Sequence, residues 1–206
     1  MFDVRIHGRN GAEVAGTAEL LAAAAVVMGL ASQLRAEPDF AAGPGWASVA
    51  VVHCLVNDAR PGDDRPGDGL ATGPPSRPQV AGLIVQDPGL LRRSDVLGGI
   101  CPETFVLVNS AQGFGELGLS EHVGGHCRDR LVILPAAGLR VVQQDGSLLC
   151  AMMAGGFAAL AGIVDLASVV AAIDELHRGP VADGCASAAR AAYQFVRTEK
   201  EAMVAA

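Results

Sequence analysis

Two continuous apolar runs near the middle of the chain constrain its fold more than any other feature. They cover residues 80–86 and 104–109, and a short helix-like stretch at residues 90–97 separates them. A strand that is apolar throughout is buried on both faces, which is typical of a parallel sheet covered by other layers. The sequence therefore predicts an α/β domain.

Strand-like and helix-like segments alternate along the rest of the chain. The predicted strands cover residues 2–7, 47–57, 80–86, 104–109 and 130–134. The predicted helices cover residues 14–35, 148–160, 167–176 and 183–197, and Asp165 begins the third of them. Such alternation, with right-handed crossovers, is typical of layered α/β domains. We expect a three-layer α/β/α domain with a mostly parallel, Rossmann-like sheet and a helical C-terminal end.

Composition favours one domain built from small side chains. The chain has 206 residues, of which 50% are hydrophobic but only 4% aromatic, so it can bury one core made mainly of Ala, Val, Leu and Ile. We expect a single domain over residues 1–206. Residues 59–79 hold five prolines and four glycines, and we expect them to form an exposed loop.

The predicted first helix is unusually apolar. Over residues 14–35, Glu19 is the only charge in the helix interior. A helix that is apolar nearly all round is covered by neighbours on most of its sides. We therefore expect this helix to lie against the sheet and also against another subunit or domain.

Charge and cysteine usage exclude several classes of function. The net charge of −7 and the lack of a long Lys/Arg run argue against nucleic acid as a partner. Lys200 is the only lysine, which excludes a Schiff-base or P-loop lysine in the core. Five widely spaced cysteines and the lack of a charged leader indicate a reduced, cytoplasmic protein. The longest uncharged stretch, residues 147–164, contains three glycines and is typical of a buried helix, so we expect no membrane association.

The turn after the first predicted strand is the first candidate site. Gly8, Arg9, Asn10 and Gly11 place backbone N–H groups at a helix N-terminus, an arrangement that suits a phosphate. The dinucleotide fingerprint is not met, because most of its glycine positions fall on other residues, and Glu13 would repel a pyrophosphate. A tight strand-to-helix turn without a ligand is the favoured alternative.

Two further polar positions carry weaker signals. Residues 121–127 include His122, His126 and Cys127. No second Cys/His pair lies at metal-ligand spacing and no Cys-x-x-Cys occurs, so we predict neither a zinc site nor an iron–sulfur cluster. Asp87 lies at the carboxyl end of a predicted parallel strand, where ligand-binding sites of open α/β sheets collect. An Asx turn or helix cap is the favoured interpretation. We predict no catalytic residue and no metal ligand in this chain.

Several short segments, in order, resemble one protein family. Residues 5–11 read Arg-Ile-His-Gly-Arg-Asn-Gly, and residues 18–22 follow as Ala-Glu-Leu-Leu-Ala. Further matches lie at residues 37–45, 84–88 and 152–164. Together they resemble the gamma subunit, or gamma domain, of the 2-oxoacid:acceptor oxidoreductases. The family's Gln in the glycine loop and its Glu-x-Arg-Gly stretch are not retained here.

The resemblance implies a function carried by an assembly. It implies an enzyme that oxidatively decarboxylates a 2-oxoacid to an acyl-CoA and passes electrons through iron–sulfur clusters to ferredoxin or NAD. It implies alpha, beta and delta or ferredoxin-like partner subunits, which hold thiamine diphosphate, Mg and the clusters, with coenzyme A as a co-substrate. The gamma chain would support the active site and the coenzyme A route, and it would not be active alone.

The resemblance also suggests contact residues. It implies that coenzyme A or a partner's cofactor is contacted by Gly8, Arg9, Asn10, Gly11, Gly43 and Gly45. Two alternatives stay open. The chain could be a structural or assembly subunit that touches no ligand, or a nucleotide-binding dehydrogenase that uses the turn at Gly8.

Overall fold

A mixed six-stranded sheet forms the centre of the molecule, seen in a computed structural model that describes residues 2–38, 48–55, 80–92, 96–119, 128–139 and 146–205. The strands are β1 (Phe2–Gly8), β2 (Ala31–Pro38), β3 (Ser48–Leu55), β4 (Val80–Val85), β5 (Phe105–Asn109) and β6 (Leu131–Leu134). Their order across the sheet is β2-β3-β1-β4-β5-β6.

Helices follow the strands and dominate the C-terminal third. The α-helices are α1 (Gly11–Val27), α3 (Gly146–Ala161), α4 (Leu166–Leu176) and α5 (Pro180–Ala205), and the short 3-10 segments are η1 (Pro88–Arg92), η2 (Arg128–Arg130) and η3 (Ala136–Gly138). The helical C-terminal end predicted from the sequence is therefore confirmed. No helix among the described residues is both long enough and apolar enough to cross a membrane.

The sheet is mostly parallel, as predicted. β1 pairs with β4, β4 with β5 and β5 with β6 in parallel, while β3 is antiparallel to both of its neighbours, β1 and β2. The two apolar runs of the sequence form β4, which pairs with β1, and β5, which pairs with β4. Their burial between two layers explains why these strands are apolar on both faces.

The first helix is shorter than predicted, and this prediction was wrong at its C-terminal end. α1 ends at Val27, and β2 begins at Ala31 where the helix was expected to continue to residue 35. Gly29 has φ of 78°, and the Leu30 N–H donates to the Ala25 carbonyl at 2.9 Å. This is the hydrogen bond of a glycine-terminated helix, and it turns the chain back toward the sheet.

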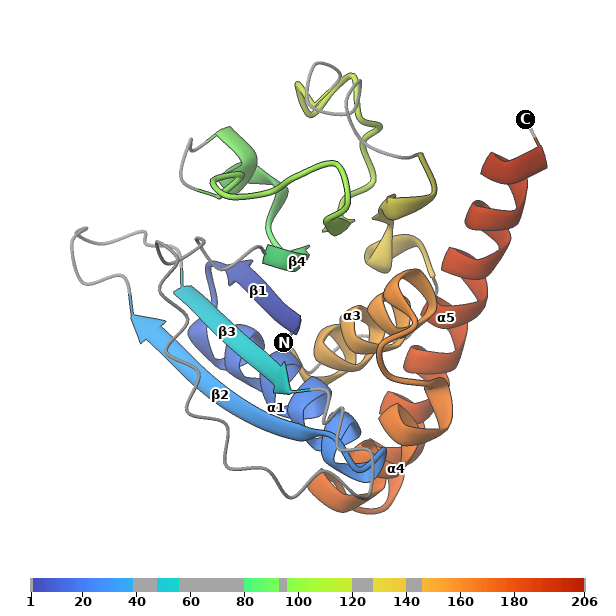
Figure 1. Ribbon diagram of the computed structural model, residues 1–206. Helices are drawn as coiled ribbons and strands as arrows, with labels where there is room; N and C mark the ends of the chain where they lie inside the picture. The colour runs from blue at the N-terminus through green and yellow to red at the C-terminus, as the bar shows by residue number, and fades with distance from the viewer. Residues whose placement is uncertain are drawn as a thin grey trace, which may run out of the picture.

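Small residues allow the helices to pack closely on one face of the sheet. A Cβ on Gly155 in α3 would overlap the backbone carbonyl of Ala189 in α5, and these two helices lie side by side in Figure 1. A Cβ on Gly82 in β4 would likewise overlap the ring of Phe157. The core on this face therefore depends on glycine at the closest approaches, as the low aromatic content suggested.

The opposite face of the sheet is covered by η1 and by turns. Leu83 and Val106 from the strands pack there with Leu90, Leu91 and Leu119. The helix predicted at residues 90–97 is replaced, within the described residues, by the 3-10 segment η1 and a later turn. Both faces of the parallel strands are thus buried, which accounts for the α/β pattern of the sequence.

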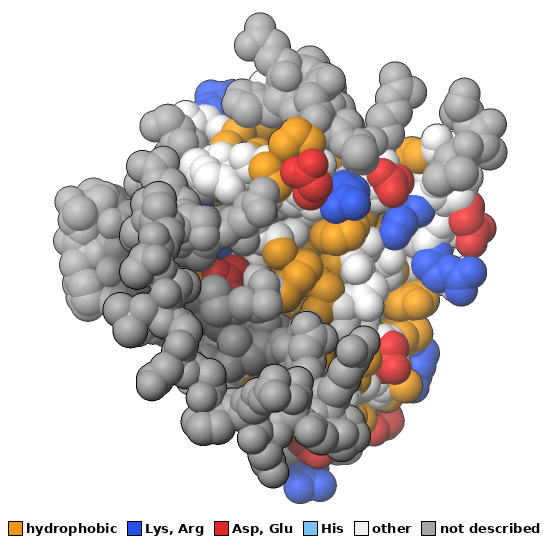
Figure 2. Space-filling view, viewed as in Figure 1, with side chains coloured by type: hydrophobic (Ala, Val, Ile, Leu, Met, Phe, Trp, Pro, Cys, Tyr) orange, Lys and Arg blue, Asp and Glu red, His pale blue; other side chains and the backbone are white. Residues whose placement is uncertain are grey.

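The last helix carries the polar surface of the C-terminal end. In Figure 2, acidic and basic side chains are interspersed on the side of the molecule where Figure 1 places α5. On α5, Arg197 Nη2 forms an ion pair with Glu201 Oε1 at 3.2 Å. The other face of α5 packs on α3, so α5 is an amphipathic covering helix.

Candidate functional site

The turn predicted as a site lies at the carboxyl end of β1. Gly8 is the last residue of the strand, and Asn10 caps α1, because its Oδ1 accepts the Ala12 N–H at 3.1 Å. A Cβ on Gly8 would lie 2.6 Å from Val14 Cγ2 and 2.7 Å from Gln86 Oε1, so only glycine fits there. The tight-turn interpretation thus explains Gly8 and Asn10, while Gly43 and Gly45 lie outside the described residues.

Arg9 and Asp87 form an ion pair across the carboxyl ends of β1 and β4. Arg9 Nε lies 2.6 Å from Asp87 Oδ2. The other carboxylate oxygen of Asp87 accepts the Gly89 N–H at 2.8 Å, which makes Asp87 the predicted Asx turn at the start of η1. The ion pair itself could not be predicted from the sequence, because the two residues lie far apart along the chain.

A pocket of about 320 Å³ lies beside this ion pair, and we call it the carboxyl-edge pocket. Its lining comes from the turn after β1, from η1 and from the turns after β5: Arg9, Pro88, Gly89, Arg92, Gln112, Glu116 and Leu117. Ligands of open α/β sheets collect at this edge, outside the carboxyl ends of the strands. The pocket is therefore the candidate site that the topology favours.

The charge of the carboxyl-edge pocket suits an anion. Arg9 and Arg92 contribute two guanidinium groups, and Arg92 makes no ion pair with any described residue. Glu116 also lines the pocket, and its Oε2 accepts the Gly113 N–H at 2.9 Å. Guanidinium groups bind phosphates and carboxylates through paired N–H donors, so the pocket could hold either kind of group.

A buried amide ties the carboxyl ends of the parallel strands to the first helix. Gln86, 5% exposed, donates from Nε2 to Thr17 Oγ1 at 2.6 Å and to the Glu13 carbonyl at 3.2 Å. Asn109 Nδ2 donates to the Gln86 carbonyl at 3.0 Å, and Asn109 Oδ1 accepts the Ala136 N–H at 3.3 Å. These bonds tie the ends of β4, β5 and β6 to α1. Gln86 was not singled out from the sequence, although a polar residue that closes an apolar strand was a usable signal.

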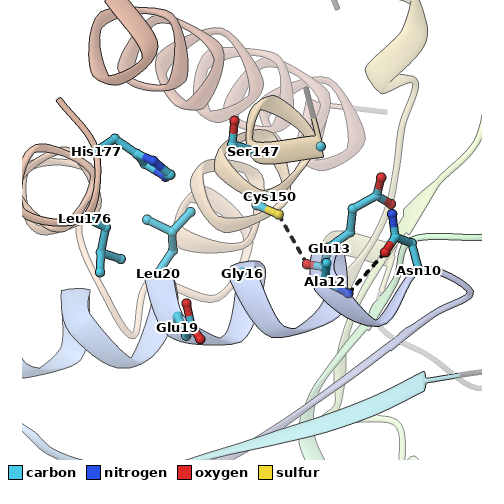
Figure 3. A pocket seen from close by; sticks show the side chains of 11 residues that line it. Asn10, Ala12, Glu13, Gly16, Glu19, Leu20, Ser147, Cys150, Leu176 and His177 are labelled. Carbon is cyan, nitrogen blue, oxygen red and sulfur yellow. Dashed lines mark hydrogen bonds between the residues drawn. The ribbon is translucent and has the colours of Figure 1, made fainter. Parts of the chain in front are cut away.

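A second pocket, which we call the helix pocket, lies between α1, the first turn of α3 and the end of α4 (Figure 3). Its volume is about 420 Å³. Glu13 and Glu19 of α1 line it together with Leu20, Cys150 and His177. The Glu13 side chain lies against Gly146, since a Cβ there would be 3.0 Å from Glu13 Oε1. A carboxylate at these two helix N-termini opposes binding of a pyrophosphate.

Cys150 in the helix pocket is a neutral thiol. Its Sγ donates to the Glu13 carbonyl at 3.2 Å, drawn as a dashed line in Figure 3. Burial raises the pKa of the Cys150 thiol from 9.0 to about 11. A thiol with such a pKa supplies little thiolate near neutral pH, so it is neither an efficient nucleophile nor a ready metal ligand.

Metal binding finds no support among the residues that the structure describes. No group of three His, Cys, Asp or Glu side chains there is placed to hold a metal ion. The segment at residues 121–127 lies outside the described residues.

Comparison with known proteins places this fold among a set of enzyme subunits. No family model matches the sequence. The chain is 30% identical over 202 residues to pyruvate synthase subunit PorC of Methanothermobacter marburgensis, and the alignment covers 96% of this chain and 98% of that relative. The corresponding subunit of Methanothermobacter thermautotrophicus is 28% identical over 199 residues, which cover 95% of this chain and 96% of the relative.

Two solved structures share the fold. Pyruvate oxidoreductase subunit PORC of Thermotoga maritima superposes with a TM-score of 0.65 at 17% identity and covers 96% of this chain and 95% of its own. The gamma subunit of the keto/oxoacid ferredoxin oxidoreductase of Geobacter sulfurreducens superposes with a TM-score of 0.58 at 17% identity, with 98% and 97% covered. The α/β architecture is therefore that of these subunits over nearly the whole chain.

Proposed function

Because this chain belongs to the gamma-subunit (PorC) family of the 2-oxoacid oxidoreductases, we propose that it completes an enzyme that oxidatively decarboxylates a 2-oxoacid to an acyl-CoA. Pyruvate is the first candidate substrate, because the relatives are named pyruvate synthase subunits. Electrons would pass through iron–sulfur clusters to ferredoxin or NAD. In this proposal the chain is a single supporting domain.

The partner subunits would hold the reactive groups. Thiamine diphosphate, when bound, supplies the carbanion stabilisation that lets CO₂ leave. The described residues offer no metal-ligand cluster for Mg or iron. Lys200, the single lysine, lies in the C-terminal helix and donates to the Leu160 carbonyl at 2.8 Å. We therefore assign thiamine diphosphate, Mg and the clusters to alpha, beta and delta or ferredoxin-like partners.

The role that we propose for this chain is to bind coenzyme A. The observation that carries this proposal is the convergence of Arg9 and Arg92 in the carboxyl-edge pocket, next to the turn from Gly8 to Gly11. Coenzyme A carries a diphosphate and a ribose phosphate, and guanidinium groups hold such phosphates through charge-assisted hydrogen bonds. Arg92 would bind a phosphate directly. Arg9 would donate to a phosphate while it keeps its ion pair with Asp87.

The coenzyme A proposal is tested by Arg92→Gln in the assembled enzyme. Loss of one charge-assisted hydrogen bond raises the KM for coenzyme A about tenfold, and the KM for the 2-oxoacid stays unchanged. Arg190→Gln, an exposed position on α5 outside the pocket, is the matched control and leaves both KM values unchanged. Equal coenzyme A kinetics in the Arg92 and Arg190 variants would contradict the proposal.

A second candidate role is assembly without ligand contact. The observation that favours it is that the polar groups of the turn already have partners inside the chain: Asn10 caps α1 and Arg9 pairs with Asp87. If Arg9→Gln and Arg92→Gln leave coenzyme A kinetics unchanged while the enzyme cannot form without this chain, the assembly role is the correct one.

A further inference from the structure

The two carboxylate oxygens of Asp87 have separate partners. Oδ1 accepts the Gly89 N–H at 2.8 Å, and Oδ2 lies 2.6 Å from Arg9 Nε. The first bond is the Asx turn at the start of η1, and that turn needs only one side-chain oxygen. The Asx turn therefore does not account for the second oxygen, which binds a side chain from the turn after β1.

The backbone around Asp87 is fixed on both sides. The Gln86 N–H donates to the His7 carbonyl at 2.8 Å, which joins the end of β4 to the end of β1. Pro88 restricts its own φ and the backbone of the residue before it. The Leu90 N–H donates to the Asp87 carbonyl at 3.1 Å. Oδ2 of Asp87 is thus an acceptor at a fixed place beside the two strand ends.

The position of the Arg9 guanidinium depends on this acceptor. Within the described part of the chain, Asp87 is the only hydrogen-bond or ion-pair partner of the Arg9 side chain. Nη2 of Arg9 lies over Gly89, since a Cβ there would be 2.9 Å from that atom. A guanidinium group donates from both Nη atoms as well as from Nε. The bond to Asp87 therefore leaves both Nη atoms for a ligand in the carboxyl-edge pocket, which Arg9 lines.

The ion pair of Arg9 and Asp87 adds little to folding stability. The two side chains are 56% and 32% exposed, and solvent weakens ion pairs with such exposure. The effect of the pair is geometric, because it restricts a long side chain to one arrangement before a ligand arrives. A binding group that is ordered in advance loses less conformational entropy when the ligand binds.

We propose that Asp87 is a positioning residue of the carboxyl-edge pocket and holds Arg9 so that its Nη atoms bind a phosphate of coenzyme A. Gly89 takes part, since a side chain there would displace the Arg9 guanidinium. The Asp87 carboxylate also repels a phosphate, but its pairing with Arg9 and screening by salt weaken this repulsion. The proposal rests on the proposed function, because it requires coenzyme A to bind in this pocket.

The test removes the charge of Asp87 and keeps the turn. Asp87→Asn retains an oxygen that can accept the Gly89 N–H, but it loses the carboxylate that holds Arg9. In the assembled enzyme, this variant should raise the KM for coenzyme A about three- to tenfold and leave kcat and the KM for the 2-oxoacid unchanged. Glu201→Gln, the matched control, removes the same charge from the ion pair with Arg197 on α5 and should leave all three constants unchanged.

A double-mutant cycle shows whether Asp87 acts through Arg9. If it does, Asp87→Asn causes no further rise in the KM for coenzyme A once Arg9→Gln is present. Gly89→Ala changes no charge but displaces the Arg9 guanidinium, so it should raise the same KM. Thermal unfolding of both single variants should match that of wild type, which separates misplacement of Arg9 from a folding defect.

Three results would overturn the positioning role. The first is a KM for coenzyme A in Asp87→Asn that equals or falls below that of wild type. The second is an equal effect of Asp87→Asn with and without Arg9, and the third is a wild-type KM in Gly89→Ala. The proposed function fails by a different result: Arg92→Gln, which removes a guanidinium that Asp87 does not hold, would leave coenzyme A kinetics unchanged, and the positioning role would fall with it.

Discussion

At the scale of single residues, glycine decides how closely the helices approach. Gly155 lies where α3 crosses α5, and the Ala189 carbonyl occupies the space that a Cβ would need. Backbone atoms cannot move aside as a flexible side chain can. Position 155 is therefore closed to every larger residue, whereas a Cβ on Gly156 or Gly184 would meet only side-chain atoms.

Gly155→Ala should lower the free energy of unfolding by about 2–3 kcal/mol, because the added methyl group pushes two packed helices apart. Gly184→Ala on α5 is the control, since a Cβ there meets only Leu148 Cδ2 at 3.6 Å. The control should leave the unfolding free energy unchanged or raise it by about 0.5–1 kcal/mol. Urea unfolding of the two variants measures the difference, and equal effects would refute this explanation of the α3–α5 contact.

The buried thiol of Cys150 makes stability depend on alkaline pH. Its pKa is raised from 9.0 to about 11, mainly by burial, so the folded protein favours the protonated thiol. This contribution is fully present below pH 9 and is lost as the pH rises through about 11. The unfolding free energy of wild type should fall by about 2 kcal/mol more than that of Cys150→Ala over this interval. Parallel pH profiles would show that Cys150 is not buried as described.

At the scale of secondary-structure elements, a predicted helix boundary held where a recognisable residue marked it. The Asp165 cap was predicted and is confirmed: its Oδ1 accepts the Ser168 N–H at 2.7 Å. Hydrogen bonds from Ser168 also lower the pKa of Asp165. The end of α1 was overlooked, because Gly29 sits inside a run that is apolar on both sides. Hydrophobic pattern alone could not separate α1 from β2, since Leu30 and Ala31 continue the apolar run past Gly29.

Asp165→Ala should destabilise the protein by about 1 kcal/mol, the usual effect of losing an N-cap. Asp174→Ala, an exposed carboxylate in the last turn of α4, changes the charge equally without touching the N-cap. The unfolding free energy of this variant should equal or slightly exceed that of wild type, because a carboxylate near a helix C-terminus is unfavourable. Thermal unfolding followed by circular dichroism distinguishes the two, and an equal loss in both variants would indicate a general charge effect rather than capping.

At the scale of the whole molecule, the fold was more predictable than the site. Alternation of strands and helices predicted the parallel strands β4, β5 and β6 and the three C-terminal helices, because burial on both faces leaves a strong pattern. The antiparallel partner β3 was predicted as a strand, but its direction depends on long-range pairing that no local pattern records.

The candidate site could be predicted only in part. The turn from Gly8 to Gly11 was expected between the first strand and the first helix and lies there. Arg92 and Gln112 were not singled out, because each lies in a turn after a different strand and carries no motif. Only the topology, which places β1, β4 and β5 side by side, brings their side chains to one pocket.

The central claim is that the assembled enzyme requires this chain for activity, although the chain does not catalyse the reaction itself. Reconstitution of the enzyme from separately purified subunits, with and without this chain, tests it most directly by following coenzyme A-dependent oxidation of pyruvate through reduction of ferredoxin. We expect full activity only when the chain is present and none from the chain alone. Turnover by the isolated chain, or full activity of the other subunits without it, would contradict the account.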